Sequence, residues 1–167
     1  MTTFTHIARN VVKDCVRQKE ERLHIIGRWH AMLGWIRVAI LEVAKGLDEG
    51  GAETEMTYCL LDMAAGATAM LQQLGVDDPA NAFVAEYERA AAKHPGMTLD
   101  SDKHTDESRY YALAEEVGEV CAALTYDNKA NTGHNSDLIS EVTQVGGLAI
   151  AWVVRLCEEE PWPSCSQ

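Results

Sequence analysis

The sequence lacks the patterns that mark several classes of protein. No uninterrupted apolar run approaches the roughly 18–20 residues of a membrane helix, and the first residues lack the basic region and apolar block of a secretory signal. Its five cysteines are an odd number without a CxxC pair, which argues against a disulfide framework or a zinc site. We therefore expect a soluble cytoplasmic protein with no membrane partner.

Strand signals and positive charge are also scarce. Phe occurs twice, β-branched residues do not alternate with polar ones, and no Asn-Gly or Asp-Gly hairpin turn occurs. Lys and Arg number 14 against 26 Asp and Glu, which gives a formal net charge of −12. Nucleic-acid binders gain affinity from clustered cationic side chains, so a nucleic-acid polymer is excluded as a partner. A small phosphorylated substrate remains allowed, because a metal ion bridges carboxylates and phosphate oxygens.

Helical periodicity fills most of the 167 residues. Gly75 is a helix-ending residue, Asp78 with Pro79 is typical of a helix start, and Thr105 is a further N-cap candidate. The pattern predicts an all-α bundle of five to six helices built from packed helical hairpins. The expected helices span residues 5–47 with a break near Gly27, 53–74, 79–93, 106–126 and 136–158.

The chain divides at about residue 78 into an N-terminal helical hairpin (1–78) and a helical unit (79–158), followed by a tail (159–167). We expect the two parts to share one compact domain. A weak internal similarity aligns Leu60–Ala65 with Val142–Gly147, and Glu42 precedes the first segment as Glu119 precedes the second. Two interpretations stay open: a degenerate repeat, or the likeness of any two amphipathic helix pairs.

Acidic residues are concentrated where the pattern predicts two helices. Glu116 and Glu119 are three residues apart, and Glu115 and Glu119 four apart, so all three lie on or near one helix face. Apolar neighbours put this face at the border of the core, where carboxylates need a cation or a proton. Antiparallel packing would bring Glu141 and Gln144 opposite them, and such oxygen ligands favour Mg²⁺ or Mn²⁺. The alternative is a solvated helix face.

In this order the residues resemble the MazG-like all-α nucleoside triphosphate pyrophosphohydrolases, in a branch common in actinobacteria and their phages. Glu115-Glu116-x-x-Glu119 followed by Glu141-x-x-Gln144 is similar to that family's EExxE…ExxD pattern, within a likeness over roughly residues 80–158. The resemblance implies a four-helix core and Mg²⁺-dependent hydrolysis of a (deoxy)nucleoside triphosphate to the monophosphate and pyrophosphate. It also implies a homodimer or homotetramer.

The resemblance assigns roles to the motif residues. It makes Glu116, Glu119, Glu141 and Gln144 the metal ligands, with Glu116 and Glu115 at the catalytic centre and Glu115 a base for water or a ligand for a further ion. Gln144 replaces the family's Asp, which keeps an oxygen donor and removes a negative charge. This replacement motivates an alternative function, a catalytically weakened MazG-like protein that binds nucleotides or regulates.

Four side chains near the motif are candidates for substrate contact. Lys129, Arg109 and Arg155 are candidates for binding phosphates, since cations assist phosphoryl transfer by neutralising charge. Trp152 is a candidate for stacking on a base. The alternative is that the three cations are ordinary surface residues and that Trp152 belongs to the core or to an interface.

Overall fold

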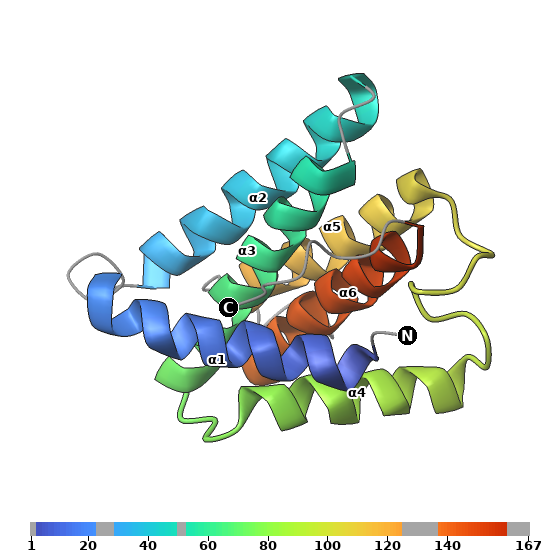
Figure 1. The fold of residues 1–167 in the computed structure, drawn as a ribbon. Coiled ribbons are helices and arrows are strands. Elements are labelled where there is room, and N and C mark those ends of the chain that lie inside the picture. The colour runs from blue at the N-terminus through green and yellow to red at the C-terminus, as the bar shows by residue number, and fades with distance from the viewer. Residues whose placement is uncertain (1–2, 23–28, 50–52, 125–136, 160–167) are drawn as a thin grey trace, which may run out of the picture.

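The computed structural model describes residues 3–22, 29–49, 53–124 and 137–159, and these ranges contain six α-helices and no strand (Figure 1). The all-α prediction is therefore confirmed. The segment expected over 5–47 forms two helices, and the expected break near Gly27 falls within 23–28, outside the described residues. With the helix that follows, the described part of 1–78 holds three helices. The helices are α1 (Phe4–Arg22), α2 (Trp29–Glu49), α3 (Glu53–Gln73), α4 (Pro79–Lys93), α5 (Asp106–Ala123) and α6 (Leu138–Glu159).

The helix ends that the sequence predicts are formed by local hydrogen bonds. After α3, Gly75 has a φ of 86° and the N–H of Val76 donates to the carbonyl of Leu71 at 2.9 Å, the Schellman arrangement that glycine permits. The side chain of Asp78 caps α4 by accepting from a backbone N–H, with Pro79 following as the first helical residue. Thr105 caps α5 in the same way.

α6 is the central helix, and α1, α3, α4 and α5 all pack on it. It is also the one helix among the described residues that is long and apolar enough, by length and composition alone, to cross a membrane. Of its most apolar stretch, 67% is buried inside the bundle, so its composition is that of a core helix. Trp152 is fully buried there, and one hydrophobic core runs from Phe4 of α1 to Leu156 of α6.

The packing pattern is unchanged when the first three helices are exchanged with the last three. α2 packs on α3 as α5 packs on α6, α1 packs on α3 as α4 packs on α6, and α1 meets α6 as α4 meets α3. The remaining contacts join the equivalent helices α1 and α4, α2 and α5, and α3 and α6, with α1 lying beside α4 in Figure 1. The two halves therefore form one domain with a shared core.

The contact between α4 and α6 depends on a glycine. A Cβ at Gly146 would meet the ring of Phe83, with the Phe83 Cζ only 2.6 Å away. At the next residue, Gly147, a Cβ would make only an ordinary contact of 3.8 Å with the Cγ of Glu86. Gly146 thus lets α4 approach α6 closely, which places the charged face of α4 beside α6.

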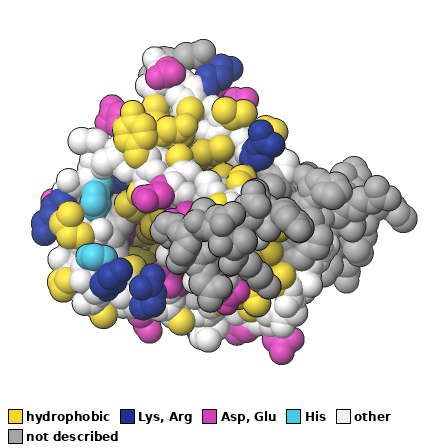
Figure 2. Space-filling model, turned by 180° about the vertical axis from the view of Figure 1, so that it is seen from behind, with side chains coloured by type: hydrophobic (Ala, Val, Ile, Leu, Met, Phe, Trp, Pro, Cys, Tyr) yellow, Lys and Arg dark blue, Asp and Glu magenta, His cyan; other side chains and the backbone are white. Residues whose placement is uncertain are grey.

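Apolar side chains gather on the surface of the first half. Val38 and Leu41 of α2 and Tyr58 of α3 are more than half exposed, and Figure 2 shows apolar side chains together on the upper part of the molecule. Contiguous exposed apolar surface is typical of interaction sites. The homodimer or homotetramer stays a prediction.

Candidate metal centre

Three carboxylates from α5 and α6 converge. Glu116 and Glu119 lie one helical turn apart on α5, and Glu141 lies in the first turn of α6. One carboxylate oxygen from each lies within 4.8 Å of those of the other two. Glu141 is buried, and the other two are partly buried. The packing of α5 on α6 therefore brings together three of the four residues that the sequence predicts as metal ligands.

The fourth residue, Gln144, lies beside these three. Its side-chain Nε2 donates a hydrogen bond of 2.8 Å to Oε2 of Glu141. The amide therefore orients one carboxylate of the cluster and satisfies one of its oxygens. Because Gln144 is neutral, the cluster carries three acidic groups where the MazG-like pattern has four.

The cluster is electrostatically strained without a cation. Oε2 of Glu116 is buried and has no hydrogen-bond partner among the described residues. Burial raises the pKa of Glu116 to about 7, and the charges of Glu119, Glu141 and Glu115 contribute in that order. The pKa of Glu141 is also raised, mainly by burial and then by its contact with Glu119. A divalent cation relieves such strain by replacing the proton, so these residues fit a hard metal ion.

Glu115 does not join the cluster. Its side chain is exposed, whereas Glu116 and Glu119 face α6, because consecutive helical residues point about 100° apart. Its charge still contributes to the raised pKa of Glu116. The expected role of Glu115 as a base or a further metal ligand has no support in this geometry.

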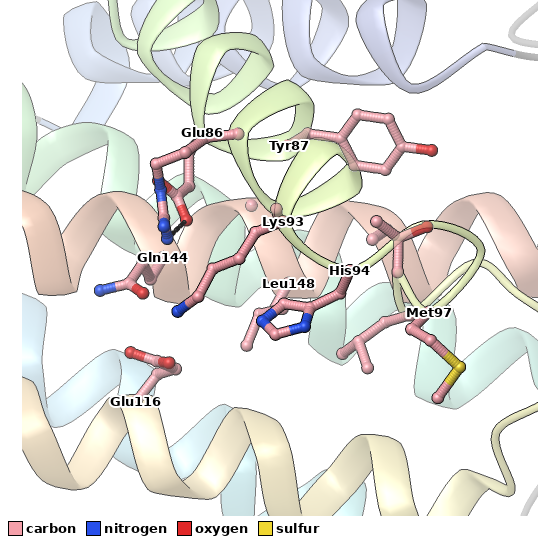
Figure 3. A pocket seen from close by; sticks show the side chains of 14 residues that line it. Glu86, Tyr87, Lys93, His94, Met97, Glu116, Gln144 and Leu148 are labelled. Carbon is pink, nitrogen blue, oxygen red and sulfur yellow. Dashed lines mark hydrogen bonds and ion pairs between the residues drawn. The ribbon is translucent and has the colours of Figure 1, made fainter.

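A cavity of about 260 Å³ opens beside the cluster, between α4, α5, α6 and the loop that follows α4. Glu116 and Gln144 form one wall. Lys93 and His94 line the cavity from the end of α4, and Figure 3 shows the Lys93 side chain pointing toward Glu116 and Gln144. Leu148 belongs to the apolar part of the lining. The cavity therefore combines an acidic wall, a cationic wall and an apolar surface.

The cationic wall was missed by the sequence analysis. Arg89 and Lys93 lie on α4 and His94 follows its last residue, all outside the acidic motif. The available signal is the recurrence of charged residues on one face of α4, at Glu86, Arg89 and Lys93. The same recurrence is typical of a solvated helix face, so only the packing of α4 against α6 identifies it as part of a site.

Arg109 has a structural place instead of the expected substrate contact. It is only 3% exposed, and its Nε and Nη2 donate to the carbonyls of Leu99 and Ser101, both at 2.7 Å. Its Nη1 pairs with Asp106 at 2.9 Å. Because these donors hold the loop between α4 and α5, which forms part of the cavity wall, Arg109 supports the cavity from behind.

The other predicted substrate residues lie apart from the cavity lining or outside the described residues. Trp152 is fully buried and donates through Nε1 to Oδ1 of Asp106 at 3.2 Å, so its ring is core and has no free face for a base. Arg155 does not line the cavity, and its Nη1 forms an ion pair of 3.7 Å with Oε2 of Glu158. Lys129 lies outside the described residues.

The first half of the chain has a partial counterpart of the cluster. The alignment of Leu60–Ala65 with Val142–Gly147 places Asp62 at the position of Gln144 and Cys59 at that of Glu141. Burial raises the pKa of the Cys59 thiol, and the charges of Asp62 and Glu42 raise it further, so these three lie near one another. Among the described residues, the three-carboxylate group belongs to the second half alone.

Comparison with family models, curated proteins and solved structures finds no match to this chain. The fold and the site thus define only a class: an all-α bundle with a carboxylate cluster on the wall of a partly cationic cavity.

Proposed function

We propose that this protein is a Mg²⁺-dependent hydrolase that converts a (deoxy)nucleoside triphosphate to the monophosphate and pyrophosphate. One observation carries the proposal: three carboxylates converge, and one of them, Glu116, lines a cavity whose facing wall is cationic. Carboxylates that could hold a metal ion, with cations across the cavity, suit a metal-bridged polyphosphate. The likeness of the motif to the MazG-like pattern supports the same reaction.

Glu116, Glu119 and Glu141 are the residues that would hold the ion. They offer oxygen donors only, which suits Mg²⁺ or Mn²⁺, and the unpartnered Oε2 of Glu116 is an acceptor without a donor. When bound, such an ion supplies charge neutralisation at the phosphates and lowers the pKa of a water molecule. Gln144 holds the Glu141 carboxylate in place through its amide.

The rest of the cavity would position the substrate. Phosphoryl transfer depends mainly on positioning and on neutralising charge. Lys93 and His94 offer cationic or donor groups opposite Glu116, while Leu148 and Ala151 exclude water from the inner surface. Hydrolysis of the bond between the α and β phosphates by water then releases pyrophosphate and leaves the monophosphate.

A second candidate is a catalytically weakened nucleotide-binding regulator, and Gln144 favours it. The amide brings no negative charge to the cluster and already donates to one oxygen of Glu141. Both effects weaken the attraction for a divalent cation. A protein of this kind would bind a nucleotide in the same cavity without turning it over.

Pyrophosphate release separates the two candidates. The protein is incubated with each NTP and dNTP in the presence of Mg²⁺, and pyrophosphate is measured for the parent, for Glu119→Ala and for Glu42→Ala. Glu42 is an exposed residue of α2 in the first half, so it controls for the loss of one acidic residue. We expect turnover by the parent and by Glu42→Ala, and loss of turnover in Glu119→Ala.

Absence of turnover with every nucleotide would reject hydrolysis. Equal turnover by Glu119→Ala and the parent would reject the carboxylate cluster as the site of hydrolysis. Equilibrium binding of the nucleotides in the same samples then decides for or against the regulator. Binding without turnover supports it, and absence of both rejects both candidates.

A further inference from the structure

The cations of the cavity differ in how far they are already neutralised. Arg89 forms two hydrogen bonds with the carboxylate of Glu86, from Nε at 2.7 Å and from Nη2 at 2.6 Å. This bidentate pair cancels the charge of Arg89 locally. The ammonium of Lys93 has no hydrogen bond or ion pair with the described residues, and it points toward Glu116 and Gln144 (Figure 3). Lys93 is therefore the uncompensated cation of this wall.

The formal charge of the metal-bound cluster favours a cation such as Lys93 on the facing wall. Three ionised carboxylates and one divalent cation leave a formal charge of −1, which repels a polyphosphate. The protein as a whole repels it too, with a net charge of −12. One ammonium on the facing wall cancels the residual charge of the cluster, and an ammonium is an ordinary ligand for phosphate.

We infer that Lys93, with His94 beside it, binds the terminal phosphates of the substrate, the part that leaves as pyrophosphate. This inference rests on the proposed function and adds the orientation of the substrate in the cavity. The phosphate under attack lies at Glu116, and the departing phosphates lie against the end of α4. The cavity of about 260 Å³ is slightly smaller than the roughly 300–1,000 Å³ of pockets that enclose whole ligands, which suits a site for the phosphate end of a nucleotide.

Lys93 should have opposite effects on the two ligands of the site. It attracts pyrophosphate and repels Mg²⁺ from the nearby carboxylates. Removing its charge with Lys93→Met should weaken pyrophosphate binding about tenfold or more. The affinity for Mg²⁺ alone should stay the same or become tighter. A side chain with only a structural role would weaken both when removed.

The test is titration calorimetry with two probes: MgCl₂ alone, and inorganic pyrophosphate with Mg²⁺ in excess. The variants are Lys93→Met, Lys93→Arg and Lys45→Met, the last removing the same charge from an exposed position on α2. We expect Lys93→Arg to keep most of the pyrophosphate affinity, since it keeps the cation. Lys45→Met should match the parent with both probes.

Each other outcome is decisive. If the parent and Lys93→Met bind pyrophosphate equally well, the inference is overturned. Binding of Mg²⁺ by the parent would still support the metal centre in that case. Parallel loss of both affinities in Lys93→Met, or an equal loss in Lys45→Met, also overturns it. If the parent does not bind Mg²⁺, the proposed function falls and the inference falls with it.

Discussion

Replacing Glu116 with Gln tests whether the carboxylate cluster is a cation site or a solvated helix face. The substitution keeps the size of the side chain and removes its charge. In the folded protein, burial and four neighbouring carboxylates raise the pKa of Glu116 from its ordinary value of 4.5 to about 7. The charged form is therefore disfavoured in the folded state, and folding stability must depend on pH.

The sign and size of this pH dependence of stability follow from proton linkage. Between pH 4.5 and pH 7 the folded protein holds the Glu116 proton more tightly than the unfolded chain does, so the free energy of unfolding falls as pH rises through this window. A shift of this size corresponds to about 3 kcal/mol. Because the side chain is partly open to solvent, screening reduces this to about 1–2 kcal/mol. We expect Glu116→Gln to be more stable than the parent by that amount at pH 8, and not at pH 4.5.

Urea unfolding of both proteins across this pH range, with EDTA present, measures the difference. Glu88→Gln is the control, since Glu88 is an exposed residue of α4 and should follow the parent at every pH. Addition of Mg²⁺ should stabilise the parent most at pH 8, where it replaces the lost proton, by about 2.7 kcal/mol at one hundred times its dissociation constant. Stability curves for the parent and Glu116→Gln that run parallel from pH 4.5 to pH 8 would refute the reasoning.

Four further substitutions test the packing and the cluster. Gly146→Ala should lower the free energy of unfolding by about 1–3 kcal/mol, because its Cβ meets Phe83, whereas Gly147→Ala should raise it by up to about 1 kcal/mol through helix propensity; denaturation of the pair checks this, and equal effects would contradict it. Gln144→Asp should tighten Mg²⁺ binding about tenfold by adding a carboxylate, and an unchanged dissociation constant in calorimetry would remove this residue from the metal shell. Arg109→Met should cost about 3 kcal/mol by leaving loop carbonyls unpaired, while its Mg²⁺ affinity should match the parent's.

The helices and their ends were predictable because their causes are local. Gly75 ends α3 through its left-handed backbone, and Asp78 and Thr105 cap α4 and α5 through bonds to N–H groups three residues on. The same holds for two of the three clustered carboxylates, since a spacing of three puts Glu116 and Glu119 on one face of any helix. Such features need no knowledge of distant parts of the chain.

The pairing of this face with Glu141 was predictable for a different reason. Two helices that are adjacent in the chain tend to pack antiparallel, and α5 packs on α6 as expected. The orientation of Glu115 was less predictable, because a helix face is wider than one residue and the rotation of α5 against α6 decides which carboxylates turn inward. The structure turns Glu115 to solvent.

By itself, the sequence determined the helix content, the glycine that ends α3, the capped starts of α4 and α5 and the spacing of the carboxylates, since each depends on residues within one or two turns. Only the tertiary structure decided which cationic side chains belong to the cavity. The donors of Arg109 are occupied by carbonyls of a loop. Lys93 lies at the cavity because α4 approaches α6 closely at Gly146. Both are basic residues on helices with polar faces. Their difference in role comes from packing, which no local pattern encodes.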